Sequence, residues 1–155
     1  MTLSQEDQFI PHLIVSDGKA ALKFYKEVFG GEEGDIMMEP EGTRLMHGEI
    51  VLDGHKLFLS DEFADKEGVL TRTPDTLGGT CVRITLQTDH ADEVVERAVA
   101  RGATVLMPLQ DMFWGARYGK IRDPYGHEWG INQQLKEQTE AETETAAKEF
   151  FAKSK

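Results

Sequence analysis

The sequence predicts an α+β fold made of two tandem βαβββ modules, and three observations support this prediction. Short segments bounded by Gly, Pro and Asp alternate apolar and polar residues with the period of a β-strand. Two longer segments space their apolar residues three and four apart, as in an amphipathic helix. The second half also repeats the first at a shift of 72 residues, so that Gly30 matches Gly102 and His55 matches His127. A duplicated module accounts for this match.

The first module begins with a predicted strand over residues 9–15 and a helix over residues 19–29. Ser16 or Asp17 can cap the start of this helix, and Gly30 ends it. Three further strands are predicted over residues 35–38, 44–52 and 55–60. The segment therefore predicts a βαβββ unit.

The second module has the same predicted order. A strand over residues 82–88 and a helix over residues 92–100 come first. Three strands then follow over residues 104–107, 118–122 and 127–132. The last two form a β-hairpin around the turn DPYG at residues 123–126, in which proline fixes one φ angle and glycine accepts a positive one.

These elements divide a single structural domain into four segments. They are the first module (1–60), a connector (61–80), the second module (81–134) and a C-terminal helical tail (135–155). A connector of this length either separates modules or lies over a site. The tail predicts a helix over residues 140–152. Its only large apolar residues, Phe150 and Phe151, are expected to dock on the chain itself or on a partner subunit.

Composition predicts a folded, soluble protein of the cytoplasm with no membrane or nucleic-acid partner. Of the 155 residues, 39% are hydrophobic, and no apolar run approaches the roughly 20 residues that a membrane helix needs. The N-terminus, MTLSQEDQ, lacks the basic and apolar regions of a secretory signal. A net charge of -11 without a basic patch argues against nucleic-acid binding. Cys81 is the only cysteine, which excludes an intrachain disulfide and a cysteine-based zinc site.

One face of the predicted strands is apolar and should pack beneath the helices, whereas the opposite face is mixed. Polar groups buried without partners cost about 1–3 kcal/mol each. We therefore expect the mixed face to line a hollow that holds water or a polar, partly aromatic ligand. The candidate ligand-binding residues on this face are His12, His47, Glu49, Phe58, Arg83, Thr85, Gln87 and Glu128.

Several of these side chains have more than one possible role. His12, His47 and Glu49 could hold a displaced metal ion, form a His-carboxylate pair for acid-base chemistry, or make a satisfied hydrogen-bond network. Arg83 could clamp a ligand carboxylate or phosphate, or it could pair internally with Glu49 or Glu128.

Three further candidates precede the hairpin, where a Trp-Gly break predicts a loop over the mouth of the hollow. Trp114 could stack on a ligand there, with Arg117 and Tyr118 beside it. Alternatively, Phe113 and Trp114 are buried in the interface of a dimer. His127 has a counterpart in the first module, which favours a structural role for it.

Four segments together resemble a known family. AALKFYKEVFG, LMHGEIVLDGHKLFLSD, TPDTLGG and FWGARYGKIRDPYGHEW are similar to segments of the glyoxalase/bleomycin-resistance/dioxygenase superfamily, also called vicinal oxygen chelate proteins, and within it to the PhnB-like subgroup. The resemblance covers residues 9–134. It implies eight strands in two curled sheets that form a cup-shaped mixed sheet, and a homodimer.

The resemblance also implies a divalent metal in the cup, held by one residue from the first and fourth strands of each module. Carried over residue by residue, these positions are Ile10, Phe58, Arg83 and Gly130. None of them supplies a metal ligand, because three have no side-chain donor and a guanidinium stays protonated. We therefore expect neither the usual metal centre nor the family activities that depend on it.

Three functions are consistent with this sequence. The first is binding or sequestration of a small polar or aromatic ligand without a cofactor, as in antibiotic resistance, where the acidic chain would attract cationic molecules. The second is a lyase or isomerase that uses His47 and Glu49, with or without a divalent metal at a displaced site. A member of the family that binds an unrelated metabolite is the third possibility.

Overall fold

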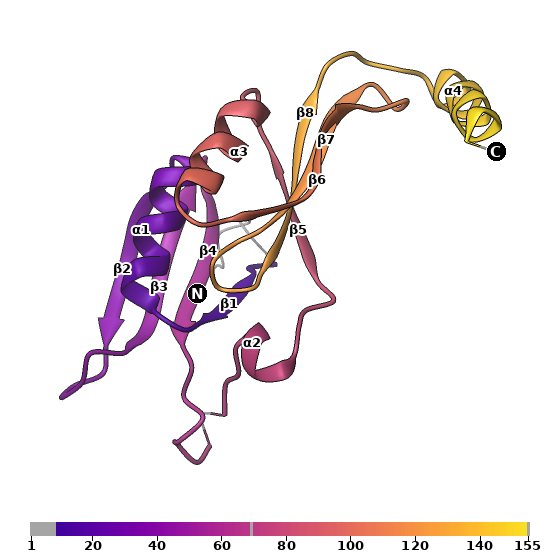
Figure 1. Cartoon of the computed structure of the whole chain (residues 1–155). Coiled ribbons are helices and arrows are strands. Elements are labelled where there is room, and N and C mark those ends of the chain that lie inside the picture. The colour runs from indigo at the N-terminus through magenta and orange to yellow at the C-terminus, as the bar shows by residue number, and fades with distance from the viewer. Residues whose placement is uncertain (1–8, 69, 155) are drawn as a thin grey trace. The chain divides into compact units, whose positions relative to one another are not determined.

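The computed structural model describes residues 9–68 and 70–154 and divides into two compact units. The first unit is the described part of Met1–Cys81 with Pro124–His127, and the second is Val82–Asp123 with the described part of Glu128–Lys155. Each unit contains one four-stranded mixed sheet (Figure 1). The predicted α+β fold with two βαβββ modules is therefore confirmed. The cup that both sheets would form stays a prediction, as does the homodimer.

The first sheet has the order β1-β4-β3-β2. Its first and fourth strands run parallel, and the other neighbours run antiparallel. The helix between the first two strands packs on one face of this sheet. The elements are β1 (His12–Val15), α1 (Gly18–Phe29), β2 (Glu32–Met38), β3 (Leu45–Leu52) and β4 (His55–Asp61).

Local sequence explains where α1 begins and ends. The side chain of Asp17 accepts a hydrogen bond from the backbone N–H of Ala20 at 3.0 Å, as expected of an N-cap. Gly30 follows the helix with φ at +83°, a left-handed conformation that glycine adopts without a steric cost. Phe24 on this helix is buried, and its ring lies 6.1 Å from the ring of Tyr125.

The second sheet repeats this topology in the order β5-β8-β7-β6, again with its first and fourth strands parallel. Its helix contacts three of the four strands. The elements are β5 (Arg83–Gln87), α3 (Ala91–Ala100), β6 (Thr104–Asp111), β7 (Ala116–Arg122) and β8 (Glu128–Gln134).

The turn between β7 and β8 is closed by its own side chains. Trp129 Nε1 donates to the Asp123 carboxylate at 2.9 Å, so the residue that opens the turn is tied to the returning strand. Gly126 takes the positive φ angle, +89°, that the turn requires. His127 Nε2 lies 2.8 Å from the carbonyl oxygen of Ile14, which gives this histidine the structural role expected of it.

Several elements differ from the sequence-based expectation. β1 begins at His12 and not at residue 9, so Ile10 precedes the strand, and β2 begins at Glu32, three residues before its predicted start. β6 runs on to Asp111, four residues past its predicted end, and includes Pro108. Proline is tolerated there because β6 is an edge strand, on which a missing N–H breaks no obligatory ladder bond. The connector also contains a short helix, α2 (Pro74–Leu77), at whose start the Thr73 hydroxyl accepts a hydrogen bond from the N–H of Thr76.

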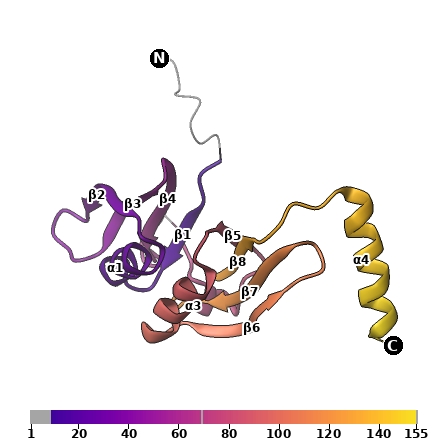
Figure 2. The same ribbon diagram turned by 90° about the horizontal axis from the view of Figure 1, so that it is seen from above.

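The tail forms α4 (Glu140–Lys153), close to the predicted range (Figure 2). Thr139 and Glu142 make a reciprocal capping box at its start. The ring of Phe113 lies 5.2 Å from that of Phe150, so the tail does contact its own chain. Phe150 and Phe151 nevertheless remain 45% and 61% exposed. None of the helices in the described part of the chain has the length and apolar content that crossing a bilayer requires.

Equivalent side chains hold the start of the helix in both modules. Asp61, at the end of β4, is buried and accepts hydrogen bonds from the backbone N–H groups of Gly18 (2.8 Å) and Leu45. Gln133, at the corresponding place in β8, accepts one from the N–H of Ala91 at 3.1 Å. The bonds from Gly18 and Ala91 each satisfy a donor that the first turn of a helix leaves without an intrahelical partner, whereas the bond from Leu45 holds the start of β3.

Asp61→Ala should therefore lower the free energy of unfolding by about 2–5 kcal/mol, because two buried N–H groups lose their acceptor. The matched change in the second module, Gln133→Ala, removes a single half-buried acceptor and should cost only about 0.5–1.5 kcal/mol. Urea unfolding of both variants measures the difference. Equal effects would mean that Asp61 does not hold the helix start in the manner described.

Candidate functional site

The open face of the first sheet brings together the polar residues predicted from the first module. α1 packs on the opposite face, which carries buried side chains such as Leu13 and Leu59. On the open face, strand pairing places His12, Phe58 and Glu49 in one row across β1, β4 and β3. The sequence prediction that these side chains share a face is therefore correct.

Glu49 is the buried centre of this face, with 6% of its surface exposed. Its Oε1 lies 3.1 Å from His47 Nε2 and its Oε2 lies 3.3 Å from Lys56 Nζ. The backbone N–H of Asp35 donates to it as well. A carboxylate with three such partners can be buried without an unsatisfied charge.

The edge strand β2 is shaped to accommodate this carboxylate. Its register against β3 shifts between Glu33 and Ile36, and a bulge of this kind turns a backbone N–H away from the ladder. That segment contains Asp35, whose N–H reaches Glu49. A Cβ at Gly34 would lie 2.7 Å from Glu49 Oε2, so only glycine leaves room here.

Electrostatics keep Glu49 ionised. Burial by itself raises the pKa of a carboxyl group, but hydrogen bonds from His47 and Lys56 and the Lys56 charge outweigh it and lower the pKa of Glu49 below its ordinary value. An ionised carboxylate can only accept hydrogen bonds, so His47 Nε2 must be the donor. The tautomer that donates from Nε2 has its acceptor at Nδ1.

Two imidazole rings and one phenyl ring cluster beside this carboxylate. The His47 and Phe58 ring centroids are 4.7 Å apart, and His12 lies 6.1 Å from Phe58 and 6.5 Å from His47, all edge to face. His12 Nε2 is also 3.2 Å from Ser60 Oγ. Part of the His12 ring is exposed, but its desolvation against these neighbours, with a smaller effect of His47, lowers its pKa. The ring is therefore neutral at neutral pH.

The open face of the second sheet brings together the polar residues predicted from the second module. Arg83 Nη2 lies 3.5 Å from Glu128 Oε2, so the internal pair proposed for this arginine is present. Asn132 donates to the side-chain oxygen of Gln87 at 2.7 Å. Thr85 is paired with Gly130, between the Arg83–Glu128 pair and the Gln87–Asn132 pair.

The three candidates before the hairpin have different surroundings. Trp114 lies 6.0 Å from the Tyr118 ring and 4.9 Å from the ring of Phe113. Arg117 is bound by Asp92 through two hydrogen bonds of 2.8 and 2.9 Å and by Asp111 at 3.0 Å. These carboxylates raise the pKa of Arg117 and occupy its guanidinium, which therefore ties α3 to β6 and β7.

The four positions at which the family resemblance implies a metal do not fit one. Ile10, Phe58 and Gly130 offer no side-chain donor, and Arg83 is a cation. At Gly130 the space is also occupied, since an added Cβ would lie 2.7 Å from Tyr118 Oη. Elsewhere in the described part of the chain, no group of three or more His, Cys, Asp or Glu side chains is arranged to hold a metal ion.

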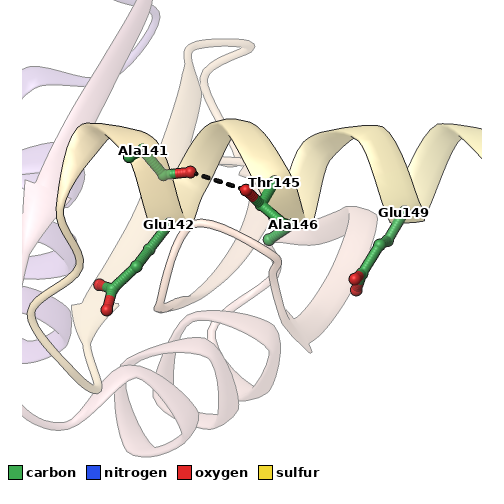
Figure 3. A pocket seen from close by; sticks show the side chains of 5 residues that line it. All are labelled: Ala141, Glu142, Thr145, Ala146 and Glu149. Atoms are coloured by element: carbon green, nitrogen blue, oxygen red, sulfur yellow. Dashed lines mark hydrogen bonds between the residues drawn. The ribbon is translucent and has the colours of Figure 1, made fainter.

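A shallow concavity lies along α4, and none of the candidate residues lines it (Figure 3). It is lined by Ala141, Glu142, Thr145, Ala146 and Glu149. All five come from one helix, and the Thr145 hydroxyl already donates to the Ala141 carbonyl at 3.0 Å. The concavity is a surface feature of the tail, and we do not assign the site to it.

Some residues of both faces were not among the predicted site residues. Ser60 and Lys56 contact His12 and Glu49 on the first sheet, and Arg122 contacts Glu128 on the second, at 3.3 Å. The alternation of side chains along a strand is enough to indicate all three. Lys56 and Ser60 each lie two positions from Phe58, and Arg122 lies opposite Glu128 in the hairpin. The Asp35 N–H could not be found in this way, since a bulge depends on how two strands pair.

The His12 ring should titrate below the ordinary value of 6.5, which NMR of the ring protons measures. Because the unfolded state then binds the proton more readily, the free energy of unfolding should fall as pH drops below about 6.5. His47→Gln should raise the His12 pKa but leave it below 6.5, since desolvation is the larger cause. His90→Ala, a change of an exposed histidine in the second unit, should leave the His12 midpoint unchanged. A wild-type midpoint at or above 6.5 would contradict the described desolvation of His12.

Comparisons with known proteins agree with this architecture. An uncharacterized protein of Mycobacterium bovis is 36% identical over 137 residues, which cover 88% of this chain and 90% of that protein. A solved structure from Pseudomonas aeruginosa superimposes with a TM-score of 0.67 at 25% identity and covers 82% of this chain and 97% of the other. A PhnB protein from Bacillus cereus shares the fold, with a TM-score of 0.61 at 21% identity over 82% of this chain and 99% of that one.

A family model also matches the chain directly. The model described as the Glyoxalase/Bleomycin resistance protein/Dioxygenase superfamily matches residues 7–131, which include all eight strands except the last residues of β8. The two βαβββ modules, the relatives and this match lead to one assignment: the chain belongs to the Glyoxalase/Bleomycin resistance protein/Dioxygenase superfamily.

Proposed function

We propose that the chain binds a small, flat, partly aromatic ligand with hydrogen-bonding groups on the open face of its first sheet, without a bound metal. The observation that carries this proposal is the cluster of His12, His47 and Phe58, three rings within 6.5 Å of one another beside the buried carboxylate of Glu49. A flat ligand can pack against such rings, and edge or face contacts between aromatic groups contribute about 0.5–1.5 kcal/mol each beyond area burial.

The polar groups of this cluster are suited to binding because they are oriented in advance. Glu49 is held by Lys56 and Asp35 and in turn fixes the orientation of the His47 ring. His12 is neutral at neutral pH and makes one hydrogen bond, with Ser60. A ligand therefore meets fixed imidazole nitrogens and loses less entropy on binding than it would to mobile side chains.

The charge of the ligand is not set by the net charge of the chain. A total of -11 favours the approach of cations over long distances. On the face itself, however, the negative charge of Glu49 is balanced by Lys56, 3.3 Å away. The proposal is therefore for a ligand chosen by shape and hydrogen bonding, with no requirement for a positive charge at this cluster.

A thermal-shift screen of small heteroaromatic compounds tests this proposal. A ligand present at 100 times its Kd should stabilise the protein by about 2.7 kcal/mol, and the shift should persist after treatment with a chelator. His47→Ala and Phe58→Leu should each reduce the shift strongly, whereas the control His90→Ala, on the exposed start of α3, should not. A shift that disappears with the chelator, or that survives both substitutions, would refute the proposal.

Proton transfer is a second candidate function, and the His47–Glu49 pair favours it. Because Glu49 is buried, ionised and bonded to Nε2, it selects the His47 tautomer whose acceptor, Nδ1, faces away from the carboxylate. A histidine held in this way can remove a proton from a bound substrate, as a lyase or isomerase requires.

Solvent exchange distinguishes an enzyme from a binding protein. If His47 acts as a base, a carbonyl compound identified by the screen should incorporate deuterium from D2O in the presence of the protein. Glu49→Gln should then slow exchange by about 100-fold or more while the compound still binds, since acid-base groups contribute factors of this size. Mass spectrometry measures the incorporation, and a bound compound that gains no deuterium would exclude this second function for it.

A further inference from the structure

The open face of the second sheet has a net positive charge, whereas the chain as a whole is strongly negative. Strand pairing places Arg83, Glu128 and Arg122 in one row across β5, β8 and β7, and Lys120 in the next row on the same face. The described residues of this face thus contribute three cations and one carboxylate, in a chain whose net charge is -11. Such a local excess makes this face a candidate binding surface for an anion.

Glu128 cannot neutralise this row. Its two oxygens lie 3.5 Å from Arg83 and 3.3 Å from Arg122, so one carboxylate is shared by two guanidinium groups. By contrast, Arg117 is held by two carboxylates at 2.8–3.0 Å. Charge-assisted bonds of full strength are usually 2.7–2.9 Å long, so Arg83 and Arg122 retain donors that Arg117 has already used.

Gly130, beside this row, lets two side chains approach the backbone of β8 closely. It is buried and has no side chain, and a Cβ built on it would lie 2.7 Å from Tyr118 Oη and 3.0 Å from Thr85 Oγ1. Two hydroxyl groups therefore meet over the backbone of β8, next to Lys120, which is paired with Gly130. Hydroxyl donors beside fixed cations are groups that bind the oxygens of an anion.

We propose that this face binds the oxyanion of a small ligand, a carboxylate or a phosphate, through Arg83, Arg122 and Lys120, with Tyr118 and Thr85 as hydroxyl donors. This inference rests on the proposed function, because it assumes that the chain binds small molecules. It adds that the ligand group bound by the second sheet is negatively charged. Arg83 stands at a position where the family resemblance implies a metal ligand. A fixed guanidinium there supplies the positive charge that a metal ion would otherwise bring to ligand oxygens.

Calorimetric titration with benzoate, phenyl phosphate and inorganic phosphate tests the site, with benzylamine as the cationic comparison. The three anions should bind and benzylamine should not, and affinity should fall as salt is raised. Arg83→Gln and Arg122→Gln should each weaken anion binding about tenfold or more, since each removes charged hydrogen bonds. Glu128→Gln should strengthen binding, because it removes the carboxylate that competes for both arginines.

Lys23→Gln on α1 is the matched control, since it changes the net charge equally at an exposed site of the first unit. Equal weakening by Lys23→Gln and Arg83→Gln would overturn the proposal, as would weaker binding by Glu128→Gln or no binding of any anion to the wild type. The ratio of phenyl phosphate to benzoate affinity shows which oxyanion the site takes. If His47→Ala abolishes heteroaromatic binding and leaves anion binding intact, the two proposals are tested separately, and either can fail alone.

Discussion

The parallel pairing of the first and fourth strands in each module is the constraint on which the rest of the structure depends. It places His12 beside Phe58 and Arg83 beside Glu128, residues that are far apart in the chain. A short turn cannot join parallel strands, so the chain needs a longer connection between them. In each module this connection contains the helix and the two antiparallel strands that precede the fourth strand. The helix then covers one face of the sheet. His12, Glu49, Arg83 and Glu128 lie on the face that remains open, whereas Arg117 lies on the side of α3 and bonds to Asp92.

The two modules have the same strand topology but differ in the side chains on it. Asp61 and Gln133 perform the same task at equivalent places, although one is a buried carboxylate and the other a half-buried amide. The open faces differ more. In the first module a charge-balanced cluster of rings surrounds Glu49, whereas in the second a row of cations surrounds a glycine. Duplication therefore provided two surfaces of the same shape, on which different chemistry could develop.

Much of this could be predicted from the sequence, because strand parity and turn residues are local properties. Parity was enough to place His12 and Glu49 on one face, and the DPYG turn was enough to define the last hairpin. What could not be predicted depends on pairing between distant segments. Pro108 argues against a strand unless that strand is known to be at an edge, and the bond between Arg117 and Asp92 joins residues 25 positions apart.

The irregular pairing of the outer strands also affects how chains can meet. Both β2 and β6 are edge strands, and both show register shifts against their neighbours. A bulged edge twists away from the straight geometry that an added strand needs, so neither edge offers a template for sheet extension or for aggregation. In β2 the same distortion delivers the Asp35 N–H to Glu49. The same bulge in β2 thus supplies a hydrogen bond to the buried Glu49 and disfavours the addition of a strand from another chain at this edge.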